Sequence, residues 1–205
     1  MSNPLLITSD VELDRGIRIP DMSISSGEIF WLECENHLCA DVFASFMLSL
    51  LKIKKGDATL SGLNIDLHKD HSVISYLNLN WSIYVDDVQK LVKYMAYSGE
   101  HKFSSAMNEF KRILEGLGSA YILDMKLSEM TPATKRITST SISLALPSLI
   151  ILLEEPFLDI DETGSAFMKK ELDNIIADGS SIIIMSESAP PSYMNKAKLS
   201  CWVTQ

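Results

Sequence analysis

The sequence lacks most features that mark secreted, membrane-spanning or nucleic-acid-binding proteins. Three cysteines in 205 residues are an odd number and too few for a disulfide framework, which indicates a reducing compartment. Lys and Arg number 18 against 27 Asp and Glu, and the resulting formal net charge of -9 argues against a nucleic-acid partner, because phosphate binding needs clustered cations.

No targeting or spanning segment is apparent either. Residues 1–10 lack the basic flank and the apolar stretch of a signal peptide. The longest apolar stretch, 142–153, is interrupted by serine and proline and is too short to cross a bilayer. We therefore expect the chain to be cytoplasmic.

What is present is an alternation of apolar strand patterns and helical patterns. Apolar residues make up 46% of a chain whose length suits one α/β domain. Residues 149–153 (LIILL) and 181–185 (SIIIM) have the composition of strands buried on both faces of a parallel sheet. Further strands are expected at 4–11, 18–24, 28–33, 58–60, 73–77 and 199–203, helices at 40–51 and 163–177, and a turn at 54–57.

The middle of the chain, from 86 to about 145, has a helical and more polar pattern. Thr131 followed by Pro132 is a typical helix start, with a hydroxyl cap and proline at the first helical position. Strands and helices at both ends with a helical block between them predict a three-layer α/β core with a mixed sheet, an N-terminal β-rich edge and an inserted helical subdomain.

Several short motifs occur in the order and at the separations found in one family. Residues 27–65 have a strand, a loop, a helix and then the turn KKGDATLSGLNI, and 147–161 read PSLIILLEEPFLDID. Leu127-Ser128 lies between them, and 181–186 (SIIIMS) follows. Over nearly its whole length the chain resembles the nucleotide-binding domain of ATP-binding-cassette (ABC) transporters.

This resemblance implies a P-loop NTPase-like (RecA-like) core with an antiparallel β edge at the N-terminus. The chain is then one ABC-ATPase-like domain over 1–205, with the core at about 1–85 and 138–205 and the helical subdomain at about 86–137. Such domains act as dimers docked on the cytoplasmic side of a membrane permease.

The phosphate loop of the family, G-x-x-x-x-G-K-[ST], cradles phosphate with backbone amides, and its lysine and hydroxyl contact phosphate and Mg²⁺. The ungapped match places Cys34, Cys39, Ala40 and Asp41 at these four positions. Both glycines, the lysine and the hydroxyl are therefore lost. We expect no ATP or Mg²⁺ cofactor, except at a composite site shared with a partner subunit.

Other positions that contact phosphate in the family have also lost the groups that bind it. The switch histidine of the family corresponds to Glu187, which cannot donate a hydrogen bond at neutral pH. The signature L-S-G-G-Q corresponds to residues 127–131, where Ser128 is the one phosphate-facing residue retained and Glu129 has the wrong charge. The Q-loop glutamine position falls at or near Leu79.

The acidic positions survive. Glu154 stands where the Walker B motif directs Mg²⁺, Glu155 at the catalytic glutamate, and Asp161 at the D-loop aspartate. Without a phosphate loop, we interpret Glu154 and Glu155 as ordinary carboxylates at a strand end rather than as catalytic groups.

Beside the Q-loop position, apolar and aromatic side chains occur among polar neighbours. Leu79, Trp81 and Tyr84 fall where a permease helix docks in the family, and they are the predicted partner-binding residues.

The leading hypothesis is therefore a pseudo-ATPase subunit, a structural or regulatory partner in a membrane transport complex, without ATPase activity of its own. Its partners are expected to be a permease and a second ABC ATPase subunit, or a second copy of this chain, at the inner face of the cell membrane. One alternative is a divergent ABC subunit that still binds or hydrolyses ATP. Another is a metal- or redox-responsive regulator built on Cys34, His37 and Cys39, although these residues make an incomplete zinc pattern and we expect no metal.

Overall fold

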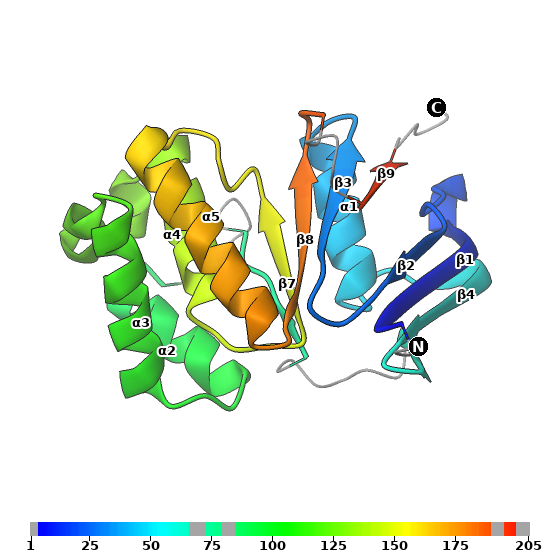
Figure 1. Ribbon diagram of the computed structural model, residues 1–205, viewed down its shortest axis with the longest axis horizontal. Coiled ribbons are helices and arrows are strands. Elements are labelled where there is room, and N and C mark those ends of the chain that lie inside the picture. Colours follow the sequence, from blue (N-terminus) through cyan, green and yellow to red (C-terminus); the bar gives the residue numbers. More distant parts are fainter. Residues whose placement is uncertain (1–3, 66–72, 79–84, 190–194, 200–205) are drawn as a thin grey trace. The chain divides into compact units, whose positions relative to one another are not determined.

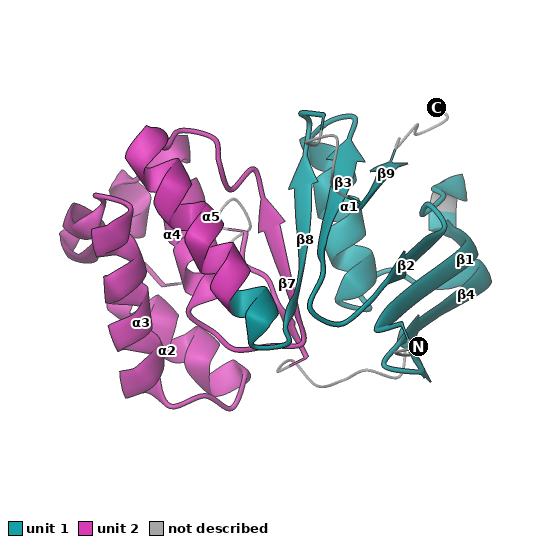
Figure 2. Ribbon diagram, viewed as in Figure 1, with its two compact units in different colours: residues 1–70, 175–205 teal, residues 71–174 magenta. Residues whose placement is uncertain are grey.

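The computed structural model describes residues 4–65, 73–78, 85–189 and 195–199, and its elements are labelled in Figure 1. The chain divides into two compact units, coloured separately in Figure 2. Unit 1 comprises Met1–Asp70 and Ile175–Gln205, and unit 2 comprises His71–Asn174. Within the ranges given above, no helix is both long and apolar enough to span a bilayer.

Unit 1 contains an antiparallel sheet in the strand order β2-β1-β4-β5. Alternate residues of β1 are buried and exposed, which is typical of a sheet with one face against the core. Its strands and the short helix between the first two are β1 (Leu6–Leu13), η1 (Asp14–Gly16), β2 (Met22–Ile24), β4 (Ile53–Leu60) and β5 (Leu63–Asn64).

The second part of unit 1 is a set of parallel strands. Strand β3 (Ile29–Cys34) pairs with β8 (Ser181–Ser186) on one side and with β9 (Asn195–Leu199) on the other. Helix α1 (His37–Met47) follows β3 and packs against β3 and β8. The buried strand β8 confirms the apolar pattern at 181–185. Strand β9 begins before the predicted edge strand at 199–203, most of which lies outside the described residues.

Two local predictions in unit 1 are wrong. Strand β4 runs without interruption through the predicted turn at 54–57. Gly56, at a φ of 83°, makes this possible, because a Cβ there would meet the backbone oxygen of Asp10 at 2.2 Å. Helix α1 begins at His37 and ends at Met47, instead of spanning 40–51.

Unit 2 is mainly helical. Two short strands, β6 (Ile74–Ser75) and β7 (Ile150–Glu154), pair in parallel, and helix α4 packs against β7. Helix α3 packs against α2, α4 and η3. The helices are α2 (Val88–Ser98), α3 (Phe103–Gly116), η3 (Ala120–Asp124), η4 (Leu127–Glu129), α4 (Pro132–Leu144) and α5 (Glu162–Ala177), and the unit boundary falls within α5.

The helix start predicted at Thr131-Pro132 is confirmed. Pro132 is the first residue of α4, and the Thr131 hydroxyl oxygen accepts a hydrogen bond from the Thr134 amide at 3.2 Å. The predicted class, α/β with antiparallel and parallel strands and a helical block in the middle of the chain, is confirmed as well.

Candidate functional site

The stretch that matches the phosphate loop lies between β3 and α1 in unit 1. Asn36 caps α1: its backbone is extended, and its side-chain oxygen accepts a hydrogen bond from the Cys39 amide at 3.2 Å. The backbone oxygen of Asn36 accepts from the same amide at 3.0 Å. The polypeptide therefore leaves the strand and enters a capped helix within two residues, Glu35 and Asn36.

The predicted phosphate-loop residues lie at the end of β3 and in the first turns of α1. Cys34, Cys39 and Ala40 are buried, and Asp41 is half-buried. One alternative hypothesis was a metal site formed by Cys34, His37 and Cys39. His37 is exposed, whereas the two cysteines are buried. In the described part of the chain, no group of three or more His, Cys, Asp or Glu residues is placed to hold a metal ion.

The position of the switch histidine also lies in unit 1. Glu187 follows the last residue of β8 and is exposed. Its neighbour Ser188 fixes the local backbone, because the Ser188 oxygen accepts from Trp31 Nε1 at 3.0 Å and the Ser188 amide donates to the Ser186 hydroxyl at 3.0 Å.

The two predicted Walker B acids lie at the end of β7 in unit 2. Glu154 Oε2 is 3.4 Å from the Tyr76 hydroxyl and 3.4 Å from Asn78 Nδ2, both at the long end of hydrogen bonding. Glu155 follows in the left-handed region at a φ of 46°, which is unfavourable for a residue with a Cβ.

A small polar pocket of about 60 Å³ opens at Glu154. Two cationic side chains of α4, Lys135 and Arg136, line it together with the carboxylate. Arg136 also forms an ion pair with Asp159, another residue in the left-handed region, at a φ of 67°. The pocket thus holds one carboxylate and two cationic side chains, and one of the cations is also paired outside it.

Asp161, the predicted D-loop residue, caps α5. Its Oδ1 accepts a hydrogen bond from the Gly164 amide at 2.7 Å, and its backbone oxygen accepts from the Ser165 amide at 2.8 Å. The side-chain bond satisfies the Gly164 amide, which has no partner inside the helix, and the backbone bond to Ser165 is the first hydrogen bond of the helix itself.

Ser128, the retained residue of the predicted signature, lies in η4 and is joined to Asp86. The Ser128 amide donates to Asp86 Oδ1 at 2.8 Å, and the Leu127 amide donates to the Asp86 backbone oxygen at 3.0 Å. Hydrogen bonds from the side chain and then the backbone of Ser128 hold the pKa of the Asp86 carboxyl below its ordinary value. Glu129, the next residue, is exposed.

A larger hollow, of about 590 Å³, lies in unit 2 beside this contact. Its lining includes apolar residues, among them Val85 and Met125, and charged side chains of both signs. The predicted partner-binding residues Leu79, Trp81 and Tyr84 lie outside the described residues.

Sequence reasoning missed the partners of the retained residues. Asn36 carries a readable signal, since asparagine is a preferred helix cap directly before an apolar helical pattern. Nothing in the sequence indicates that Asp86 pairs with Ser128, or Tyr76 and Asn78 with Glu154, because these contacts join distant parts of the chain.

The fold is that of the ATP-binding subunits of ABC transporters. One solved structure, an ATP-binding subunit of an ABC transporter, superposes with a TM-score of 0.73 at 12% identity, covering 89% of this chain and 79% of that chain. A putative ABC transporter ATP-binding protein from Pyrococcus furiosus superposes with a TM-score of 0.70 at 21% identity, covering 95% of this chain and 96% of that chain.

A third similar structure is CbiO1 from Clostridium perfringens, described as part of the ABC transporter complex CbiONQ. Its TM-score is 0.64 at 16% identity, with 91% of this chain and 80% of that chain covered. No protein-family model and no curated protein sequence matches the chain. The P-loop NTPase-like core predicted from the motifs is thus confirmed at the level of fold.

Proposed function

We propose that the chain is a catalytically degenerate ABC-type ATPase subunit that acts as a structural or regulatory partner in a membrane transport complex. Its partners are a permease and either a second, ATP-competent ABC subunit or a second copy of the chain, on the cytoplasmic face of the cell membrane. The fold supports the general class, and the contacts of the matched catalytic positions support the loss of hydrolysis.

The cap of α1 is the observation that carries the proposal. In the matched register, Cys39 takes the place of the second loop glycine and Ala40 that of the lysine. A phosphate group needs free amides at this helix start, whereas both Asn36 oxygens accept from the Cys39 amide. Helix α1 already includes the lysine position, since it begins three residues before it, at His37.

The surroundings of Glu154 also support the proposal. A carboxylate that directs Mg²⁺ is expected among oxygen ligands and waters. Here Lys135 lines the same pocket and adds positive charge that opposes a divalent cation, and Arg136 lines it as well, with its charge partly offset by Asp159. The carboxylate has hydrogen-bond donors in Tyr76 and Asn78 instead.

Ser128 gives a third line of support. Its hydrogen bonds go to the Asp86 carboxylate, so a phosphate group would have to displace one anion and approach another, Glu129. Replacing neutral glycine by glutamate next to the phosphate position has the same unfavourable sign.

The hollow beside Asp86 is the part of unit 2 that best suits a partner segment. Its lining combines apolar residues with both signs of charge, as protein interfaces do. It lies next in sequence to the predicted partner-binding residues Leu79, Trp81 and Tyr84, and it includes Val85 and Asp86. We assign the permease contact to this region.

One observation favours the alternative of a divergent, ATP-hydrolysing subunit. Glu155 holds a left-handed backbone that costs about 1–3 kcal/mol, and strain of this kind concentrates at functional sites. The pseudo-ATPase remains the better account, because Asp159 and other described residues away from this position share the left-handed backbone, whereas the contacts at the phosphate-loop, Glu154 and Ser128 positions all oppose nucleotide binding.

Calorimetry of the purified full chain tests the proposal. We expect no binding of MgATP at millimolar concentration. The Asn36→Gly/Ala40→Lys variant, which is altered within the 34–42 loop, is measured beside the wild type to show whether any binding depends on this loop. Micromolar binding by the wild-type chain that persists when this loop is altered would favour the divergent enzyme.

The assembled complex offers a second test. In a pseudo-ATPase, Glu155→Gln leaves transport essentially unchanged, whereas in a working subunit it removes the group that polarises the attacking water. Pull-down from native membranes is expected to recover a permease and an ATP-competent subunit. Recovery of a permease with this chain alone would exclude the paired arrangement.

A further inference from the structure

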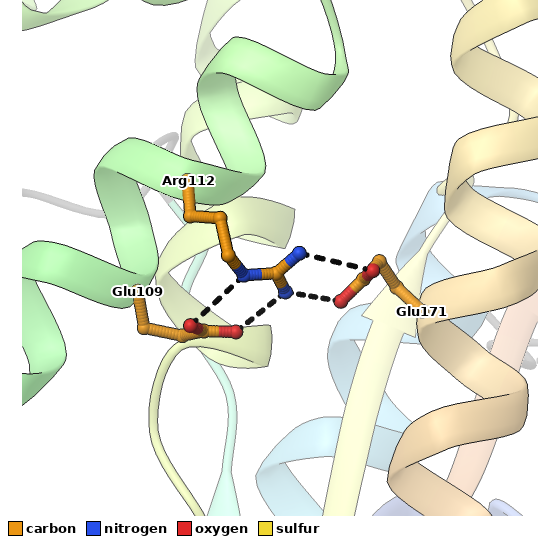
Figure 3. Close-up of polar contacts among 3 residues, drawn as sticks. All are labelled: Glu109, Arg112 and Glu171. Carbon is orange, nitrogen blue, oxygen red and sulfur yellow. Dashed lines mark hydrogen bonds and ion pairs between the residues drawn. The ribbon is translucent and has the colours of Figure 1, made fainter.

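Arg112 of α3 contacts two carboxylates in unit 2, one on its own helix and one on α5 (Figure 3). Its Nη1 donates to Glu171 Oε1 of α5 at 3.1 Å, and its Nη2 forms a second, short contact with Glu171 Oε2. Its Nε donates to Glu109 Oε2 on its own helix, α3, at 3.0 Å, and its Nη2 donates to Glu109 Oε1 at 2.6 Å. The guanidinium therefore makes a two-pronged pair with each glutamate.

The two carboxylates differ in their exposure. The Glu109 side chain is 42% exposed, whereas that of Glu171 is 8% exposed. An exposed ion pair contributes little to stability, but a buried carboxylate that loses its cation is left uncompensated. The bond to Glu171 is therefore the stronger of the two, and it is the one that joins α3 to α5.

The helices also fit closely beside this pair. A Cβ on Gly116 of α3 would meet ring atoms of Phe167 of α5 at 2.2 Å, so the ring lies directly on the glycine backbone. The Arg112 guanidinium is 5.8 Å from the centre of the same ring, within the range of a cation–π contact. Arg112, Gly116, Phe167 and Glu171 thus form one contact between α3 and α5.

On its other sides, α3 packs against α2, η3 and α4. Its buried apolar residues include Phe110, Ile113 and Leu114. We propose that Arg112 is a polar clamp that holds the α2–α3 layer on α5, and that loss of the clamp releases this layer as a local unit while β7 stays folded. The inference requires neither nucleotide nor a permease, so it stands apart from the proposed function.

Hydrogen exchange followed by mass spectrometry on the full chain tests the clamp. Glu171→Gln leaves no buried charge behind but replaces the charge-assisted pair between α3 and α5 by weaker neutral hydrogen bonds of the same shape, and Glu109→Gln is the matched control on the same guanidinium. We expect exchange in peptides of α2 and α3 to rise at least about tenfold in Glu171→Gln, with little change in peptides of β7 or of unit 1, and less than about threefold in Glu109→Gln.

Equal effects of the two variants would overturn the clamp, as would a rise spread evenly over the whole chain, which indicates general destabilisation. Arg112→Lys provides a second comparison if Glu171→Gln does not fold. Lysine keeps the charge but loses the planar fork. We expect faster exchange confined to α2 and α3 in this variant too, and wild-type rates there would contradict the proposal.

Discussion

Replacing Asn36 by alanine removes the side-chain cap of α1 without touching the core. The change deletes the hydrogen bond of 3.2 Å from the Cys39 amide to Asn36 Oδ1. Caps of this kind contribute about 1 kcal/mol, within a range of about 0.5–2 kcal/mol, and α1 packs against β3 and β8, so the loss reaches the parallel strands of unit 1. For a chain of this length, about 1 kcal/mol corresponds to a melting temperature lower by about 2–4 °C.

Urea denaturation of the wild type, Asn36→Ala and Asn36→Asp measures the effect. Aspartate also accepts the capping bond, so Asn36→Asp is expected to stay within about 0.5 kcal/mol of the wild type. Neither variant is expected to bind MgATP. If Asn36→Ala is as stable as the wild type, the cap does not hold α1. If Asn36→Ala gains nucleotide binding, the amides at the helix start form a working phosphate site that Asn36 covers, and the proposal of a pseudo-ATPase is wrong.

Three further outcomes follow from backbone and charge. Glu155→Gly is expected to be about 1 kcal/mol more stable than Glu155→Ala, because only glycine adopts the left-handed backbone freely, and equal unfolding free energies would contradict the φ of 46°. Asp161→Ala is expected to lose about 1 kcal/mol through the cap of α5, while Asp161→Asn keeps most of it, as chemical denaturation would measure. The Asp86 pKa is lowered from its ordinary value of 3.8, so the stabilisation it gives is complete above that pH and is lost as pH falls through its lower folded value. The stability difference between wild type and Asp86→Asn is thus expected to be constant near neutral pH and to shrink only under acid, and a change between pH 6 and 8 would refute this cause.

The fold class was predictable because its signals are local and repeated. The apolar strands at 149–153 and 181–185 and the Thr131-Pro132 start each follow from a few adjacent residues. The predicted turn at 54–57 failed for a non-local reason: Gly56 supports a strand because the backbone of Asp10 passes close to it.

The candidate site was predictable in its residues but not in its contacts. The family match located Glu154, Ser128 and Asp161, since motif order and spacing are written in the sequence. Their partners come from folding: Asp86 lies 42 residues from Ser128, and Asn78 lies 76 residues from Glu154. No periodicity or propensity specifies such pairs. The predicted domain limits and the partner-binding role of Trp81 stay predictions.

The contacts of the retained acids bear on why they persist beside an altered phosphate loop. Asp161 caps α5, and Glu154 accepts hydrogen bonds from Tyr76 and Asn78 in a pocket lined by Lys135 and Arg136. Each carboxylate therefore stabilises its own segment, because Asp161 satisfies a helix amide and Glu154 accepts from two side-chain donors. Cys39 and Ala40, by contrast, are small buried residues of α1, where glycine would lower helix stability and lysine would bury a charge. If the subunit is degenerate, as we propose, residues with a structural use beyond nucleotide binding are kept, whereas the 34–41 stretch has its structural use as the capped start of α1.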